Sequence, residues 1–201
     1  MSKLRIAGAA LVAATVMGAT AANAAEAGWY ASIGGGVNWV DVNDENNVEW
    51  DMEGGYTVQG AVGYDFGDNG SSVGKFRVEA EIAYTQNDNE SVKAGGTTFN
   101  IGGDLEQTSF MVNGLFDFMP NSGFRPYVGV GLGVVDAEQT VSLAGISASA
   151  NGTEFAYRGL AGVGVPLGDS VTLDVGYRYT RVTSDTEYAN NAVVAQVRFG
   201  F

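Results

Sequence analysis

Charged side chains recur at alternate positions in two stretches of the sequence. Arg77, Glu79 and Glu81 are separated by single small or apolar residues, and Asp174 and Arg178 share one parity of a later stretch. In an extended strand such residues lie on one face, with about 7 Å between Glu79 and Glu81. Two carboxylates at that separation could act as a general acid/base pair, and alternating acids and bases could instead neutralise each other as ion pairs.

Ion pairing explains these charges better than catalysis. The sequence contains no histidine, which excludes Ser–His and Asp–His chemistry. Arginines on the same face would keep both carboxylates ionised. We therefore expect no enzyme activity, no catalytic residue and no cofactor, and a network of ion pairs in their place. The predicted network contains Asp65, Arg77, Glu79, Glu81, Asp117, Arg125, Arg158, Asp174, Arg178 and Arg198.

An acidic stretch resembles a calcium-binding loop only in composition. It runs from Asp41 to Asn46, and Glu49, Asp51 and Glu53 follow. The glycine that a calcium loop needs at its sixth position is absent, and no helix is expected on either side. We predict a solvated acidic loop and no metal site. The alternative is weak bridging by Ca²⁺ or Mg²⁺ to phosphates of lipopolysaccharide.

Eight stretches alternate apolar residues with polar or small ones, which is the pattern of half-buried β-strands. Each has about ten residues, the length that a tilted strand needs to cross a bilayer. Long connections at 41–55, 87–107 and 136–154 alternate with short ones, so the long loops share one end of the molecule. The predicted strands are Trp29–Val40, Tyr56–Asp65, Phe76–Gln86, Thr108–Phe118, Phe124–Val135, Phe155–Val165, Val171–Arg181 and Asn191–Phe201.

The two faces of these strands differ sharply. One face is apolar, and its aromatic residues concentrate near the strand ends, as in the two belts of a membrane barrel. The other face carries the charged network, with glycines that we expect to make room for guanidinium groups. The predicted belts are Trp29, Phe66, Phe76, Phe118 and Phe199 at one rim and Trp39, Tyr56, Tyr84, Phe110, Phe155 and Tyr179 at the other. The glycines are Gly34, Gly36, Gly129, Gly131, Gly133, Gly162, Gly164 and Gly176.

These patterns predict an eight-stranded antiparallel up-and-down transmembrane β-barrel with short periplasmic turns and long extracellular loops. At eight strands the interior is just wide enough for side chains to fill it. We therefore expect a lumen that is plugged by ion pairs. A soluble barrel of the lipocalin type, with its apolar face inward, is disfavoured because the aromatic residues of eight strands would overfill a small interior.

The N-terminus resembles a secretory signal peptide. Lys3 and Arg5 precede an apolar run from Ile6 to about Val16, and Ala22-Asn23-Ala24 matches a cleavage site. We assign residues 1–24 to the signal peptide and 25–201 to a single barrel domain. The alternative is an N-terminal membrane anchor, because residues 6–25 carry no charge.

The net charge constrains the partners. The formal charge is −13, and the removal of Lys3 and Arg5 with the signal peptide would make it more negative. Nucleic acid is therefore excluded as a partner. Anionic lipid head groups would also be repelled unless divalent cations bridge the two surfaces. The chain has no cysteine, so an exported form needs a source of stability other than disulfides.

Several motifs resemble the small OmpA/OmpX-type and opacity-like outer-membrane surface proteins. They are Arg77–Glu81, Arg125–Gly133, Gly176–Tyr179 and the terminal stretch Val197–Phe201. The resemblance spans the whole chain after the signal peptide. It implies location in the bacterial outer membrane and recognition of Phe201 by the barrel assembly machinery. No peptidoglycan-binding domain follows the barrel, so a tethering role is not implied.

The resemblance and the residue pattern together give the expected function. We expect a monomeric integral outer-membrane protein with a structural or surface-antigen role, in contact with outer-membrane lipids and lipopolysaccharide. Adhesion of the extracellular loops to a host or envelope ligand is compatible with their composition. The alternative function is a small porin-like channel that passes water or ions through the polar lumen.

Overall fold

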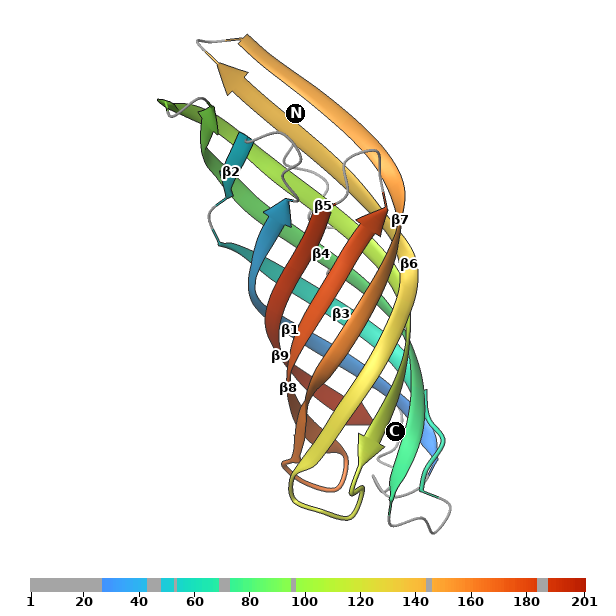
Figure 1. Cartoon of the computed structure of the whole chain (residues 1–201). Coiled ribbons are helices and arrows are strands. Elements are labelled where there is room, and N and C mark those ends of the chain that lie inside the picture. The colour runs from blue at the N-terminus through green and yellow to red at the C-terminus, as the bar shows by residue number, and fades with distance from the viewer. Residues whose placement is uncertain are drawn as a thin grey trace.

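The computed structural model of the chain describes residues 27–42, 48–52, 54–68, 73–94, 97–143, 146–183 and 188–201. These residues form one antiparallel sheet of nine strands (Figure 1). Among them, no helix is both long and apolar enough to cross a membrane. The strands are β1 (Gly28–Val42), β2 (Val48–Met52), β3 (Gly55–Asp65), β4 (Gly74–Ala94), β5 (Thr97–Phe118), β6 (Arg125–Leu143), β7 (Ile146–Pro166), β8 (Val171–Thr183) and β9 (Tyr188–Gly200).

The sheet closes into a barrel with eight wall strands. Its order is β2-β4-β3-β1-β9-β8-β7-β6-β5, and an additional β4–β5 pairing joins the two sides. Both β2 and β3 pair with β4, β2 near the end of β4 and β3 over residues 77–86. They are thus successive parts of one wall strand. The predicted eight-stranded antiparallel up-and-down barrel is confirmed.

The register determines how far the strands tilt. Cross-strand partners lead from Asn38 on β1 once round the barrel, through Arg178 and Leu115 among others. They return to β1 at Gly28, ten positions before Asn38. A stagger of ten residues over eight strands corresponds to a tilt of about 40° and a backbone radius of about 8 Å. Side chains can fill an interior of that width.

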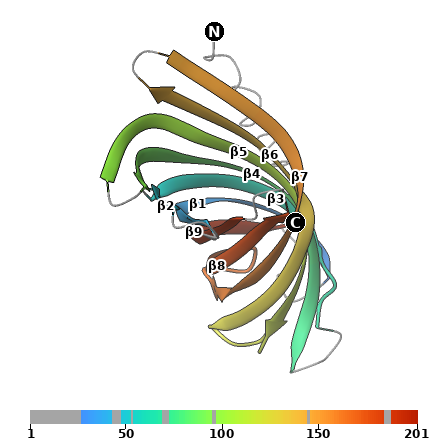
Figure 2. The same ribbon diagram turned by 45° about the horizontal axis from the view of Figure 1, so that its top comes forward.

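Two hairpins continue well beyond the barrel wall. Strands β4 and β5 are joined through residues 95–96, and β6 and β7 through residues 144–145. Figure 1 shows both hairpins projecting from the end opposite to the C-terminus, and Figure 2 shows them from a second angle. The predicted loops 87–107 and 136–154 are therefore wrong as loops, because most of their residues lie in strands. An antiparallel pair keeps its hydrogen bonds without an apolar face, so polar Ser- and Thr-rich sequence could continue the ladder.

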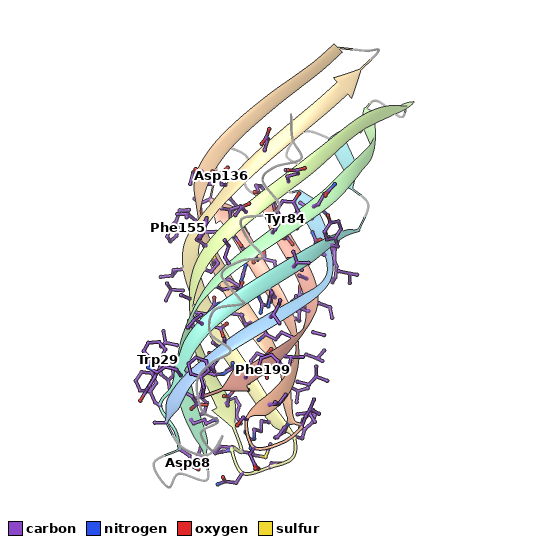
Figure 3. All side chains as sticks on the ribbon, turned by 180° about the vertical axis from the view of Figure 1, so that it is seen from behind. Trp29, Asp68, Tyr84, Asp136, Phe155 and Phe199 are labelled. Carbon is purple, nitrogen blue, oxygen red and sulfur yellow. The ribbon has the colours of Figure 1, made fainter. Side chains whose placement is uncertain are left out.

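The outer wall is apolar, as the sequence pattern predicts. Val130, in the part of β6 that belongs to the wall, is 71 % exposed, and Trp29 is 56 % exposed at the start of β1. Trp29 packs edge-on against Tyr64, with ring centroids 5.4 Å apart, and at the other end Trp39 lies 6.2 Å from Tyr177. Figure 3 shows Trp29 and Phe199 toward one end and Tyr84 and Phe155 toward the other.

The spacing of these aromatic rings fits a bilayer. Trp29 and Trp39 are ten residues apart on β1. At a tilt of about 40° that separation rises about 25 Å along the barrel axis. This height equals the apolar band of outer-membrane barrels, so the wall residues between the belts face hydrocarbon.

Candidate functional site in the barrel lumen

The lumen collects most of the predicted charged residues. Nine of the ten have less than a tenth of their surface exposed, because every second residue of a tilted wall strand points inward. They come from six of the wall strands, so contacts among them connect strands that are distant in sequence. The nine are Asp65, Arg77, Glu79, Glu81, Asp117, Arg158, Asp174, Arg178 and Arg198.

Glu81 lies at the centre of one charged cluster. Its Oε1 accepts from Arg158 Nη1 at 2.5 Å, and its Oε2 accepts from Arg178 Nη1 at 2.6 Å. Arg178 Nη1 also donates to Gln59 Oε1 at 2.5 Å. The amide of Gln59 in turn donates to Gln196 Oε1 at 2.6 Å. This cluster bridges β3, β4, β7, β8 and β9 across the lumen.

A second cluster lies nearer the end with short turns. Arg198 binds Asp174 through two parallel hydrogen bonds, from Nε at 3.0 Å and from Nη2 at 3.1 Å. Lys75 Nζ lies 2.5 Å from Asp65 Oδ2, and Arg198 Nη1 approaches the same carboxylate at 4.0 Å. Paired geometry of this kind is what allows ionised groups to persist away from bulk water.

Arg77 forms the core of a third cluster and is completely buried. Its Nε lies 3.0 Å from Asp117 Oδ2, and its guanidinium carbon lies 5.1 Å from the ring centre of Tyr127 and 5.8 Å from that of Tyr30. The Tyr30 hydroxyl donates to Glu79 Oε2 at 2.9 Å. Cation–π contacts with two rings therefore supplement a single close carboxylate.

Arg125 lies apart from the three clusters. It is half-buried at the start of β6, where its Nε donates to the backbone carbonyl of Ser122 at 3.2 Å. Sequence reasoning also missed Lys75, which has the same parity as Arg77. The predicted strand began at Phe76, whereas β4 begins at Gly74, so an earlier strand start would have revealed it.

Two of the eight predicted glycines, Gly162 and Gly176, make room for a tyrosine ring rather than for a guanidinium group. Most of the others face backbone atoms or other side chains of a neighbouring strand. A Cβ added at Gly162 would lie 2.5 Å from the Tyr127 hydroxyl, and one at Gly176 would also overlap that hydroxyl. A Cβ at Gly63 would overlap the Tyr30 ring. Among the atoms nearest to the eight predicted glycines, one guanidinium nitrogen is found, Arg198 Nη2 at 3.5 Å from the added Cβ of Gly164. Gly63, Gly162 and Gly176 therefore serve Arg77 indirectly, because they leave room for the rings of Tyr30 and Tyr127, which cover its guanidinium group.

The outer end of the lumen contains an apolar cluster that sequence reasoning did not identify. It consists of Met111, Val135, Ala156 and Val182, with Tyr188 packed against them. The Tyr188 hydroxyl accepts from the side chain of Gln107 at 2.9 Å. Burial, with the nearby charge of Glu154, raises the pKa of Tyr188 to about 12. Tyr188 therefore stays protonated at neutral pH and adds an uncharged ring at this end of the lumen.

The predicted acidic loop lies outside the described residues or among those whose side chains are not described. In the part of the chain with described side chains, no group of three or more Asp or Glu residues is arranged to hold a metal ion. One described acid beyond the barrel wall, Asp136, accepts from the hydroxyl of Thr153 at 3.3 Å.

Comparisons with known proteins agree with the geometry. The family described as outer membrane protein beta-barrel domain matches residues 8–201. Outer membrane protein PagN of Salmonella typhimurium is 24% identical over 173 residues, which cover 70% of this chain and 71% of PagN.

Solved structures show the same fold. Neisserial surface protein A (NspA) is 23% identical, with a TM-score of 0.60, over 87% of this chain and 99% of NspA. The attachment invasion locus protein Ail of Yersinia pestis, crystallised with the heparin analogue sucrose octasulfate, is 21% identical with a TM-score of 0.52. That match covers 87% of this chain and 99% of Ail. The chain belongs to the outer membrane protein beta-barrel family and is a protein of the bacterial outer membrane.

Proposed function

We propose that the protein is a non-enzymatic surface barrel that presents a β-sheet outside the cell for contact with another polypeptide. The observation that carries the proposal is the sheet formed by β4 to β7 beyond the wall. Pairing of β5 with β6 extends to Gly102 and Ser142, and pairing of β6 with β7 extends to Leu143 and Ile146. The two hairpins are therefore joined into one extension, which Figure 1 shows above the barrel.

One edge of this sheet is open in the described part of the chain. Residues 146–154 of β7 pair with β6, whereas β8 begins to pair with β7 only at Phe155. A strand edge of this kind offers backbone N–H and C=O groups to an extended segment of a partner. Charged residues and proline commonly protect a strand edge from pairing. The sequence from Ile146 to Thr153 contains neither.

Charge indicates which partners suit this surface. Glu106, Asp136 and Glu138 are exposed beyond the barrel wall, and the whole chain has a charge of −13. Like charges would repel a sulfated polyanion such as the ligand in the Ail complex. We therefore propose a neutral or basic polypeptide, from a host or from the envelope, and not a heparin-like glycan.

Adhesion assays would test this role. Cells with and without the gene would be applied to immobilised matrix proteins and to heparin, and binding to at least one protein should depend on the gene. Replacing residues 140–149 with Asn-Gly should weaken that binding strongly, because it removes residues 146–149, about half of the open β7 edge. Replacing residues 92–99 in the other hairpin serves as the matched control and should preserve binding. Equal adhesion with and without the gene would exclude the proposal.

The packed lumen supports a closed barrel over the alternative of a channel. Salt bridges and apolar side chains occupy it from the Lys75–Asp65 pair at one end to Tyr188 near the other. Planar-bilayer recordings of the refolded protein should show no reproducible openings. Stable unitary conductance would instead favour the small porin-like channel.

Export and assembly depend on the two ends of the chain. We propose residues 1–24 as the signal peptide, Phe201 as the assembly signal, and a monomer in contact with membrane lipids and lipopolysaccharide. The position of Phe201 supports its role in assembly. Strand β9 pairs with β1 where the barrel closes, and the backbone N–H of Phe201 donates to the carbonyl of Trp29 at 2.9 Å. Deletion of Phe201 should lower the amount of folded barrel in the outer membrane in a quantitative immunoblot, and unchanged amounts would exclude this role.

A further inference from the structure

We propose that the open edge of β7 selects a partner segment in which apolar residues alternate with Lys or Arg. The inference rests on the proposed function, because it names the sequence pattern that the same edge would bind. Residues 146–154 of β7 pair with β6, and within the described part of the chain β8 joins β7 only from Phe155. Figure 1 shows this end of β7 at the margin of the extension. A bound segment would become the next strand of the sheet, with its side chains alternating between the two faces.

One face of the extension has an apolar sequence. Val135 of β6 and Ala156 of β7 belong to the buried cluster at the outer end of the lumen. Every second residue of an extended strand shares a face. Beyond the wall, the residues with the parity of Val135 and Ala156 are apolar or small except for Gln139 and Glu154. They are Ala137, Val141 and Leu143 on β6 and Ile146, Ala148, Ala150 and Gly152 on β7. Residues of an added strand on this face would therefore lie beside apolar neighbours and should be apolar themselves.

The other face carries carboxylates close to the open edge. Glu106 of β5 and Glu138 of β6 are direct cross-strand partners, and both are exposed. Like charges in this arrangement are unfavourable, so a cationic group from a partner would relieve their repulsion. Asp136 is also exposed, and its Oδ2 accepts from the hydroxyl of Thr153 on β7 at 3.3 Å. A carboxylate of β6 therefore contacts the strand that has the open edge.

Basic side chains on an added strand can reach these carboxylates. Neighbouring strands lie about 4.8 Å apart, so the added strand would lie about 10 Å from β6. The long stems of Lys and Arg allow the charged end to cross β7. The residues of β7 with this parity are short, namely Ser147, Ser149, Asn151 and Thr153.

Charge also indicates which segments would not bind. An acidic segment would be repelled by the carboxylates of β5 and β6. A second copy of this chain is disfavoured as the partner, because residues 146–154 contain no Lys or Arg to pair with Asp136 or Glu138. The selected pattern is thus apolar residues on one face and basic residues on the other.

Peptide binding to the full chain in phosphatidylcholine nanodiscs would test this pattern. One labelled octapeptide consists of four Lys-Val repeats, and its control has the same composition in two blocks, four Lys followed by four Val. In fluorescence anisotropy the alternating peptide should bind about tenfold more tightly, because only it can pair along the edge and sort its side chains between the two faces. Equal affinities would overturn the proposal, since charge alone would then explain the binding. An octapeptide of four Glu-Val repeats should not bind, and binding as tight as that of the Lys-Val peptide would also overturn it.

Variants of the protein locate the binding. Replacing residues 140–149 with Asn-Gly should strongly reduce the preference for the alternating peptide, because it removes residues 146–149 of the edge. Asp136→Asn should weaken binding of that peptide about two- to fivefold, as expected for an exposed ion pair. Asp169→Asn, at an exposed residue between β7 and β8, is the matched control and should leave the affinity unchanged. Equal effects of the two substitutions, or a preference that the hairpin replacement leaves unchanged, would contradict the proposal.

The adhesion and peptide assays separate this inference from the proposed function. If adhesion depends on the gene but the alternating and block peptides bind equally, the surface role stands and the sequence pattern is wrong. If the alternating peptide is preferred but adhesion does not depend on the gene, the edge has this selectivity and the surface role is wrong.

Discussion

Arg178 shows how a single lumen residue can determine stability. It contacts Glu81, Gln59 and Gln196 at once. Arg178→Ala leaves Glu81 with half of its counter-charge, so we expect a loss of about 3 to 5 kcal/mol. Val175→Ala, on the lipid-facing side of the same strand, should cost about 1 kcal/mol. Urea unfolding in lipid vesicles, followed by tryptophan fluorescence, measures both, and equal midpoints would contradict a stabilising network.

A substitution at Gly36 would test how closely β1 and β9 pack where the barrel closes. A Cβ at Gly36 would overlap the carbonyl oxygen of Val193 on β9, and the backbone there is not free to move away. Gly36→Ala should therefore prevent or strongly weaken closure of β1 against β9. Gly159→Ala is the control, because nothing lies within 4 Å of its added Cβ. Heat-modifiable migration in gels reports closure, and equal folded fractions for the two variants would disprove a tight seam.

At the residue scale, the sequence predicted which face of a strand each side chain lies on. It did not predict as well which side chains contact each other. Alternation places Glu81, Arg158 and Arg178 on one face, and this is enough to predict that they point inward. It does not indicate which of them meet, because that depends on the stagger of the strands. The contacts of Tyr30 and Tyr127 with Arg77 were missed for the same reason, because parity places both rings in the lumen but does not place them beside Arg77.

The position of β6 in the lipid-facing wall predicts how a charge on its outer face would change the stability of the barrel. Val130 is the most exposed of the large apolar residues on β6 and lies near the middle of the wall. Val130→Arg should destabilise the barrel by about 2 to 4 kcal/mol, because it places a charge in hydrocarbon. Leu167→Arg, at an exposed residue in a short turn, should change stability by less than about 0.5 kcal/mol. Similar unfolding free energies for the two variants would contradict the assigned bilayer position.

The projecting hairpins should be dispensable for folding. Residues 140–149 pair only within the β6–β7 hairpin and with the projecting part of β5. Their replacement with Asn-Gly supplies a two-residue hairpin turn, so we expect the barrel to fold with an unchanged urea midpoint. A fall of the midpoint comparable to that of Arg178→Ala would show that the extension is part of the stable core.

At the element scale, the sequence predicted the wall strands but not their full length. Membrane strands such as Tyr56–Asp65 have a strict apolar alternation, which the lipid imposes, and their bounds were close to the observed β3. Beyond the bilayer, no apolar partner imposes a pattern. Ser- and Thr-rich sequence there is compatible with both loop and strand, so β2 and the outer halves of β4 to β7 could not be distinguished from loops.

The whole molecule combines an apolar exterior with a charged interior, the reverse of a soluble barrel. Six strands contribute buried charges, and the chain has no cysteine. We therefore expect stability to come from backbone closure, from the bilayer around the wall and from ion pairs within it. Because the outer sheet lies beyond the barrel wall, we expect its sequence to tolerate change without loss of the barrel.

Spin labels at successive positions of β5 test this reversed arrangement most directly. The absence of native cysteines allows single cysteines to be placed from Phe110 to Phe116 in turn. Labels at Phe110, Val112, Gly114 and Phe116 should be accessible to oxygen dissolved in the lipid. Labels at Met111, Asn113 and Leu115 should be shielded from it, giving a period of two. A uniform profile, or one in which the odd-numbered positions are the lipid-accessible ones, would contradict the account.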